Sequence, residues 1–240
     1  TIKRKDNFIM FNYSQIESDF FNPIVRECRG SILEDETFNP VCFPFYKFGN
    51  YGEGYVDTID WNTAKVQEKL DGSFIKLWHY NNEWRISTNG MIDARDAELS
   101  SNVCEYKTFY DLFMKAAENV ELDFGKLDKS NTYLFELISP FNKVVVPYRG
   151  ISIVHIGTRN MQTLQESEVD IGVAKPKQYS FSSMEECINV AQELPFNEEG
   201  YVVVDANWHR IKIKSPAYVA VHHLRNNGVV TKSRIVELIR

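Results

Sequence analysis

Long apolar runs, paired cysteines, internal repeats and low-complexity linkers are all missing from this 240-residue sequence. The apolar runs 144–146 and 202–204 are far shorter than the roughly 20 residues that a membrane span requires. The charged N-terminus has no apolar stretch behind it, as a signal peptide would. We therefore expect no membrane association. The length predicts one large domain, or one and a half, with a sizeable core.

The cysteines are few and widely separated, at Cys28, Cys42, Cys104 and Cys187. Zinc sites and redox motifs need two ligands within a turn or two, so we predict reduced, structural thiols and a cytoplasmic location. The sequence has 27 basic and 33 acidic residues, a net charge of −6. This balance argues against nonspecific wrapping of nucleic acid, but it permits a local basic cleft.

The hydrophobic pattern predicts an α+β fold with many short antiparallel strands and few helices. Helices are expected from Tyr106 to about Val120, at 183–193, and near the end at 217–223 and 232–240. Short alternating segments at 24–48 and a loop at 49–54 come first. Strands are expected at 66–70, 73–80, 84–88, 132–138, 143–146, 151–156, 200–204 and 209–214.

The sharpest local signal is Lys69, placed one residue before the Asp-Gly turn of Asp71 and Gly72. Glycine allows the backbone to turn and to approach a ligand closely. The segment thus places an amine beside a tight turn where a ligand can bind. Taken alone, the same four residues are better explained as a surface hairpin turn.

Lys212 and Lys214 alternate along a strand and therefore share one face. Two such lysines create a positive pocket for phosphates, and they would make a nearby Lys69 less willing to hold its proton. A solvated strand face is the alternative. Glu136 and Glu199 lie within apolar strands, where a carboxylate is costly unless it is paired or binds a metal. For them the alternative is a structural ion pair.

These segments, in this order, resemble the motifs of the covalent nucleotidyltransferases, the superfamily of ATP-dependent ligases and mRNA-capping enzymes. The motifs are Lys69-Leu70-Asp71-Gly72, Phe135-Glu136-Leu137, Ile153-Val154-His155-Ile156, Glu199-Gly200-Tyr201-Val202-Val203 and Ile211-Lys212-Ile213-Lys214. Further segments resemble the phage-type RNA ligases (RNA ligase 1, the tRNA-repair ligase family). They are Arg26-Glu27-Cys28-Arg29-Gly30, the stretch 135–145 and Lys212-Ile213-Lys214-Ser215-Pro216-Ala217-Tyr218-Val219.

The resemblance covers roughly Asn7 to Tyr218, and it implies a nucleotidyltransferase (ATP-grasp-like) domain of mainly antiparallel sheets with flanking helices over residues 1–240. Members of the family usually carry an appended C-terminal helical domain that helps to choose the RNA. We expect that domain to be absent or truncated here. The turn Ser87-Thr88-Asn89-Gly90 lacks a lysine found in some relatives, which leaves its role in phosphate or RNA contact open.

The implied reaction joins RNA ends that carry a 5′-phosphate and a 3′-hydroxyl, through a lysyl-AMP and an adenylylated RNA. Its cofactors would be ATP and Mg²⁺, with Mn²⁺ as a substitute. The implied substrate is broken RNA, including nicked tRNA, in a bacterial or phage-infected cell. The implied protein is a monomer, with an end-healing kinase or phosphatase as partner.

The resemblance also implies residue roles. Lys69 would be the nucleophile, Lys212 and Lys214 would hold the α-phosphate, and Asp71 would orient the nucleotide or the nucleophile. Glu136 and Glu199 would engage Mg²⁺. Arg29 and Lys47 would contact the pyrophosphate or the RNA phosphate. The adenine slot would be formed by the main chain of Glu68, with Ile156 and Val202 as its walls. The other expected nucleotide-binding residues are Gly72, Glu136 and Tyr218. His155 is expected to be a core histidine.

Three other functions compete with RNA ligation. An mRNA-capping guanylyltransferase would use the same lysine with GTP, and a DNA nick ligase would use it with ATP. Both are disfavoured because the sequence shows no C-terminal oligonucleotide-binding barrel. A noncatalytic RNA-binding module is the third alternative. Nucleotide preference separates a ligase from a capping enzyme, and a covalent adduct separates both from a binding module.

Overall fold

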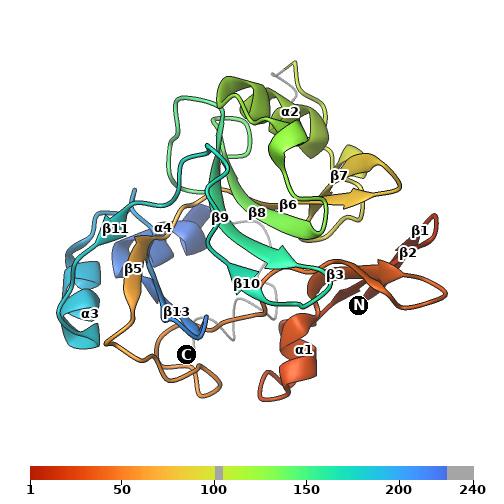
Figure 1. Cartoon of the computed structure of the whole chain (residues 1–240). Helices are drawn as coiled ribbons and strands as arrows, with labels where there is room; N and C mark the ends of the chain where they lie inside the picture. Colours follow the sequence, from red (N-terminus) through yellow and green to blue (C-terminus); the bar gives the residue numbers. More distant parts are fainter. Residues whose placement is uncertain (101–104, 226–240) are drawn as a thin grey trace.

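Three antiparallel sheets make up most of the structure, a computed structural model that describes residues 1–100 and 105–225 (Figure 1). The N-terminal sheet has the order β1-β2-β3-β4. The pairing is antiparallel throughout, as the α+β prediction requires. The strands are β1 (Ile2–Lys5), β2 (Phe8–Asn12), β3 (Arg29–Glu34) and β4 (Pro40–Cys42).

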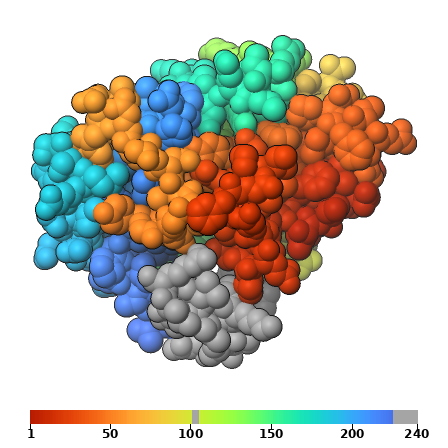
Figure 2. All heavy atoms as spheres, turned by 90° about the horizontal axis from the view of Figure 1, so that it is seen from below, coloured from red at the N-terminus to blue at the C-terminus, as the bar shows by residue number. Residues whose placement is uncertain are grey.

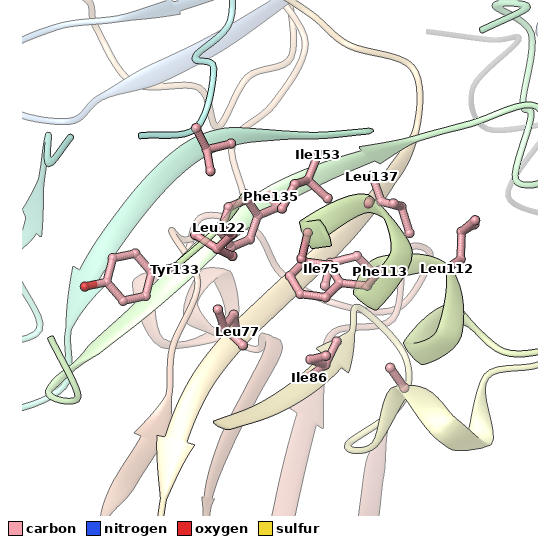
Figure 3. Close-up of a cluster of buried hydrophobic side chains, with 14 of the residues drawn as sticks. Ile75, Leu77, Ile86, Leu112, Phe113, Leu122, Tyr133, Phe135, Leu137 and Ile153 are labelled. Carbon is pink, nitrogen blue, oxygen red and sulfur yellow. The ribbon is translucent and has the colours of Figure 1, made fainter. Parts of the chain in front are cut away.

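The central sheet has the order β10-β9-β8-β6-β7, and helix α2 (Phe109–Asn119) covers one of its faces. Thr108 starts this helix with a capping box to Asp111, which is why it begins three residues later than its apolar periodicity suggested. The apolar side chains of helix and sheet interlock beneath it (Figure 3). The strands are β6 (Ser73–Tyr80), β7 (Glu83–Thr88), β8 (Asn131–Ile138), β9 (Ser152–Asn160) and β10 (Glu166–Ser167).

This interface is the largest part of the core. Ile75, Leu77, Phe113 and Phe135 are all fully buried in it. Side chains of this size each contribute roughly 2 kcal/mol by leaving water. The opposite face of the sheet packs on the N-terminal sheet through Trp78, so β6 is covered on both sides.

The third sheet has the order β11-β5-β12-β13. Helix α3 (Met184–Glu193) packs on the face that carries Val66, Val203 and Ile211. The other face carries the cross-strand row Gln67–Val202–Lys212 and turns toward the central sheet. The strands are β5 (Lys65–Glu68), β11 (Gln178–Tyr179), β12 (Gly200–Val204) and β13 (Arg210–Lys214), followed by helix α4 (Pro216–Arg225).

Buried arginines tie the sheets together by two-bond contacts with carboxylates. Arg210 on β13 binds Glu166 on β10 at 3.0 and 2.5 Å, which links the third sheet to the central one. Arg159 on β9 binds a carboxylate of helix α1 (Pro23–Glu27) at 2.7 and 2.9 Å. Such bidentate contacts fix orientation as well as distance. The gap between the sheets is therefore held at a set width.

Most of the expected elements are confirmed, and one is wrong. Residues 143–146 form a bend and not a strand, because the backbone N–H groups of Val145 and Val146 donate to the Asp71 carboxylate instead of to a neighbouring strand. The expected strand 66–70 ends at Glu68. The expected helix at 232–240 and Cys104 lie outside the described residues. Across the described ranges, no helix combines the length and apolar character needed to cross a bilayer.

Candidate active site

A pocket lies between the facing surfaces of the central and third sheets, where β5 runs into the Lys69–Gly72 turn. The third sheet supplies its polar and positive wall, and the central sheet supplies Phe74, Glu136 and Ile156. The predicted residues that line it are Arg29, Glu68, Lys69, Glu136, Ile156, Val202, Lys212 and Lys214. The tertiary structure thus brings into one pocket residues that are up to 185 positions apart, from Arg29 to Lys214.

Lys69 is held at the centre of this pocket by its backbone and by its amine. Its N–H donates to the carbonyl of Gly200 at 2.8 Å. Its Nζ lies 2.7 Å from Oε1 of Glu199, and the Nζ of Lys214 lies 3.3 Å from the same oxygen. Glu199 is only 5% exposed. A single buried carboxylate therefore fixes two of the predicted catalytic amines.

Two glycines allow the backbone to come this close. A Cβ on Gly72 would lie 2.4 Å from the carbonyl oxygen of Leu137, and the Gly72 N–H donates to Glu136 at 3.0 Å. Gly200 has φ +132°, and a Cβ there would lie 2.1 Å from the carbonyl oxygen of Ile213. A side chain at either position would push apart the strands that carry the site.

The positive groups of the pocket crowd one another. The pKa of Lys212 lies well below its usual value, first because the amine is buried and then because of the charges on Lys47, Arg29, Lys69 and Lys214. Lys212 also lies over the ring of Phe48, at 5.0 Å. Crowded like charges in a poorly hydrated space are stabilised by an anion. The pocket is thus suited to a phosphate group.

Arg29 points into the same pocket through a sandwich of aromatic rings. Its guanidinium lies 4.8 Å from the Phe45 ring centroid and 4.7 Å from that of Phe74. Within the described residues its buried Nη1 has no hydrogen-bond partner. Lys76, fully buried on β6, donates to the carbonyl of the adjacent Gly30, and burial lowers the pKa of this lysine to about 8. Arg29 therefore offers an unused donor on a fixed backbone.

Glu136 is buried beside a second carboxylate, Glu199, an environment in which a bound cation would stabilise its charge. Burial raises its pKa to about 7, and the negative charge of Glu199 adds to the effect. Lys69 and Arg29 oppose that rise. Among the described residues there is no cluster of three or more His, Cys, Asp or Glu that could hold a metal. Magnesium keeps several waters and commonly uses one or two carboxylates together with substrate phosphates, so the pair Glu136 and Glu199 fits it.

Asp71 and Tyr218 are placed behind the turn and do not line this pocket. Asp71 is 4% exposed and accepts hydrogen bonds at 2.7 Å from the N–H groups of Val145 and Val146. It accepts a third, also at 2.7 Å, from the hydroxyl of Tyr218 on α4. Burial raises the pKa of that phenol. These contacts hold the turn that carries Lys69. The expected role of Asp71, to orient the nucleotide or the nucleophile, and the expected nucleotide contact of Tyr218 stay predictions.

Lys47 also lies outside the lining of the pocket. Its side chain is 5% exposed, and its ammonium is surrounded by the rings of Tyr13, Phe20 and Tyr55, at 5.2, 4.7 and 5.6 Å from their centroids. Its charge still acts on Lys212. Its expected contact with the pyrophosphate or the RNA phosphate stays a prediction.

The structure shows which partners the charged side chains of the segment Arg26–Gly30 bind. Its charged side chains diverge to separate partners: Arg26 binds Asp57 at 3.0 and 2.6 Å, Glu27 binds Arg159, and Arg29 enters the pocket. The first two contacts hold the backbone from which Arg29 projects. Sequence alone gave no indication of these pairings, because their partners lie 31 and 132 residues away.

Several lining residues were missed by sequence reasoning. Phe45, Phe48 and Phe74 form the apolar side of the pocket, and Gln67, Leu70, Pro176 and Arg210 complete it. Aromatic residues flanked by prolines near 40–48 were the only signal, and it also fits a core. His155 is the core histidine expected: it is buried, its Nε2 contacts Gly157 and Thr158, and burial lowers its pKa to about 4.

The lysine in a two-sheet pocket, the glycine turn and the two nearby carboxylates are the features that the resemblance to covalent nucleotidyltransferases predicts. Residues 27–218 match the RNA ligase family. A protein of Autographa californica nuclear polyhedrosis virus, named as a bifunctional polynucleotide kinase/RNA ligase, is 33% identical over 233 residues, covering 90% of this chain and 33% of the viral protein. An RNA ligase of Rhodothermus phage RM378 is 25% identical over 304 aligned positions, covering 98% of this chain and 68% of that protein.

The fold is also similar to that of a solved RNA ligase of Naegleria gruberi, determined with ATP and Mn. The TM-score is 0.50 at 14% identity, over 67% of this chain and 52% of that one. The chain belongs to the RNA ligase family. It spans about a third of the viral kinase/ligase and about half of the Naegleria chain.

Proposed function

We propose that residues 1–240 are the adenylyltransferase domain of an ATP-dependent RNA ligase that joins 5′-phosphate and 3′-hydroxyl ends. The observation that carries this proposal is the crowding of cations around Lys69. Lys212, Lys214 and Arg29 surround a pocket that opens beside its amine. A triphosphate relieves that crowding, and its α-phosphorus would then lie beside the nucleophile.

In the first step, the unprotonated Nζ of Lys69 forms a bond to the α-phosphorus of ATP while the bond to pyrophosphate breaks. Oε1 of Glu199, at 2.7 Å, is within reach of the proton that Lys69 loses. Lys212 and Lys214 stabilise the charge that develops on the phosphoryl oxygens. Arg29 contacts the outgoing pyrophosphate with its free Nη1 donor.

In the second step, an oxygen of an RNA 5′-phosphate attacks the same phosphorus, and the bond to Lys69 breaks. In the third, a 3′-hydroxyl attacks the activated 5′-phosphate, and AMP leaves. The same lysines serve all three reactions, because each of them passes charge through a phosphoryl group. Asp71 and Tyr218 act as positioning residues by holding the turn from behind.

Glu136 and Glu199 would hold a magnesium ion, with manganese as a substitute, through its waters. When bound, the metal neutralises phosphate charge during each transfer. The relatives supply context for the substrate. A kinase joined to a ligase prepares 5′-phosphate ends, so the viral relative supports an end-healing partner. We propose repair of broken RNA in a bacterial or infected cell, with nicked tRNA as a target, by a monomer.

The adenine is proposed to bind between Ile156 and Val202, which lie on facing sheets of the pocket, beside the main chain of Glu68. A flat base fits between two apolar side chains. This orientation directs the triphosphate toward Lys212 and Lys214 at the other end. A capping enzyme would instead prefer GTP at the same place.

The test is incubation with α-labelled ATP and magnesium, followed by a denaturing gel, after pretreatment with pyrophosphate to remove any AMP already bound. Label is expected on the wild type and on Lys65→Ala, and none on Lys69→Ala. Lys65 begins β5, the strand that leads into the turn with Lys69, and it pairs with Glu168 on the surface, so it is a matched control. Label from GTP in preference to ATP, or label that survives in Lys69→Ala, would contradict the proposal.

A further inference from the structure

A fully buried lysine lies on the central strand β6, and none of the three reaction steps above uses it. Lys76 is 0% exposed, and on the same face of the strand lie Phe74, which lines the pocket, and Trp78, which packs on the N-terminal sheet. Figure 2 shows the red and orange segments of the first part of the chain, to which this sheet belongs, on the outside of the molecule. Lysine is almost never fully buried unless it has a partner.

The partner of Lys76 lies in an irregular part of β3. Arg29 and Ser31 pair with consecutive residues of β2, so Gly30 between them is left out of the ladder as a β-bulge. Gly30 has φ +77°, a conformation that favours glycine. A bulge bends its strand and changes the direction of the side chains beside it. The direction of Arg29 is therefore set by the conformation of Gly30.

Lys76 holds this bulge by a hydrogen bond. The bulge takes Gly30 out of the regular ladder, and the Nζ of Lys76 donates to the Gly30 carbonyl. A Cβ on Gly30 would lie 2.8 Å from that Nζ and 2.7 Å from the carbonyl oxygen of Asn89. The bulge is thus packed closely between β6 and the turn that follows β7, and it has little room to move.

Arg29 is therefore held by β6 at two places. Its guanidinium lies 4.7 Å from the ring centroid of Phe74, and the carbonyl of the next residue, Gly30, accepts from Lys76. One strand thus fixes both the side chain and the backbone of Arg29. Burial lowers the pKa of Lys76 to about 8, and the charge of Arg29 contributes to that shift, so the two cations are close enough to interact.

We propose that Lys76 is a positioning residue for Arg29 during lysyl-AMP formation, an inference that rests on the proposed function. By holding the Gly30 carbonyl, Lys76 fixes the bulge, and the bulge directs Arg29 toward the outgoing pyrophosphate. Lys76 is absent from the described lining of the pocket, so it acts through Arg29. A displacement of about 1 Å in a group that contacts the transferred phosphate can lower the rate about a hundredfold.

The test is a double-mutant cycle between Lys76→Met and Arg29→Ala. Methionine fills most of the space of lysine but cannot donate to Gly30. Single-turnover labelling with α-labelled ATP measures lysyl-AMP formation, and calorimetry measures the Kd for inorganic pyrophosphate, both after the same pretreatment and removal of its pyrophosphate. We expect Lys76→Met to lower the rate about tenfold to a hundredfold in the wild-type background. In the Arg29→Ala background it should change the rate by no more than about twofold, because the group that it positions is gone.

Trp78→Phe is the matched control. Trp78 lies two residues further along the same face of β6, and its Nε1 donates to the hydroxyl of Ser87 at 2.7 Å, so this variant removes a buried donor that is not directed to the bulge. It should lose stability in urea denaturation and keep the wild-type rate of lysyl-AMP formation. Lys76→Gln retains a donor, so it should recover part of the rate, and it replaces Lys76→Met in the cycle if that variant does not fold.

An equal loss of rate in both backgrounds would show that Lys76 acts on the fold alone, and it would overturn the proposal. A wild-type rate in folded Lys76→Met would overturn it too. If the wild type forms no lysyl-AMP, the ligase proposal fails instead. The affinities for pyrophosphate across the same cycle would then still decide whether Lys76 acts through Arg29.

Discussion

Two groups of buried cations lie close together in this protein and differ in the charged groups that surround them. Arg26, Arg159 and Arg210 each face one carboxylate through two hydrogen bonds, and their side chains are 13, 8 and 6% exposed. Lys212 and Arg29 lie within a few residues of two of these arginines, but neither has a bidentate carboxylate among its described contacts. The charges that act on Lys212 belong to other cations, whereas Arg29 lies near Arg210 and also near Tyr13, Glu136 and Glu166. The first group connects the sheets, and the second faces the pocket.

The difference shows how a fold separates stability from binding. A buried cation with a bidentate carboxylate has its desolvation cost offset by that partner. A cation crowded by like charges has no such compensation until an anion arrives. The sites that cost the free protein stability are thus the ones proposed to bind phosphate. Changing one member of each group tests this difference.

The largest effect is expected for Lys212→Met, on activity. Lysyl-AMP formation should fall about a hundredfold to a thousandfold, as when one preorganised donor to a developing oxyanion is removed. The free energy of unfolding should stay the same or rise, because methionine removes a charge that its neighbours repel. Single-turnover labelling and urea denaturation measure the two quantities. A large loss of stability would place Lys212 with the structural group.

Arg210→Met should produce the opposite pattern. It leaves Glu166, whose side chain is 7% exposed, without its partner, so the free energy of unfolding should fall by about 3–5 kcal/mol. The double variant Arg210→Met/Glu166→Gln should recover much of that loss, because the orphaned charge is gone. Urea denaturation of these two variants, the single variant Glu166→Gln and the wild type gives the coupling energy. If the single variant is as stable as the wild type, this clamp contributes nothing to the fold.

Glu136→Gln tests the pocket through pH. The carboxyl has a folded pKa raised to about 7 from 4.5, so the unfolded chain releases its proton at lower pH than the folded protein does. The free energy of unfolding therefore falls as the pH rises from about 4.5 to 7, because Glu136 ionises less readily in the folded protein than in the unfolded chain. The variant should be more stable than the wild type by about 1–3 kcal/mol at pH 8. A gap between the two proteins that stays constant from pH 5 to pH 8 would contradict the raised pKa.

The smallest effect is expected for Tyr218→Phe, which removes one donor to the buried Asp71 carboxylate. The free energy of unfolding should fall by about 1–2 kcal/mol, with a modest loss of lysyl-AMP formation. Tyr148→Phe is the matched control, because its hydroxyl accepts a longer bond, 3.2 Å, from the Asp71 N–H. Equal losses in the two variants would show that the charge on Asp71 adds nothing to the contact.

Local sequence pattern determined much of the scaffold. Strands β6, β12 and β13 and helix α2 lie close to where periodicity placed them, because alternation and helical spacing are properties of neighbouring residues. The order of the motifs also indicated that Lys69 and the β13 lysines would share a pocket. That inference came from resemblance to a family and not from periodicity.

Only the tertiary structure decided which partners surround Lys47, Asp71 and Tyr218. Lys47 is surrounded by rings from three segments, and Asp71 binds amides 74 and 75 residues along the chain and a hydroxyl 147 residues along it. The same contacts turned the expected strand at 143–146 into a bend. Residue type and spacing define which groups a side chain can bind. Which partner it meets depends on segments remote in sequence, and burial then decides whether its charge is compensated within the fold or left for a ligand.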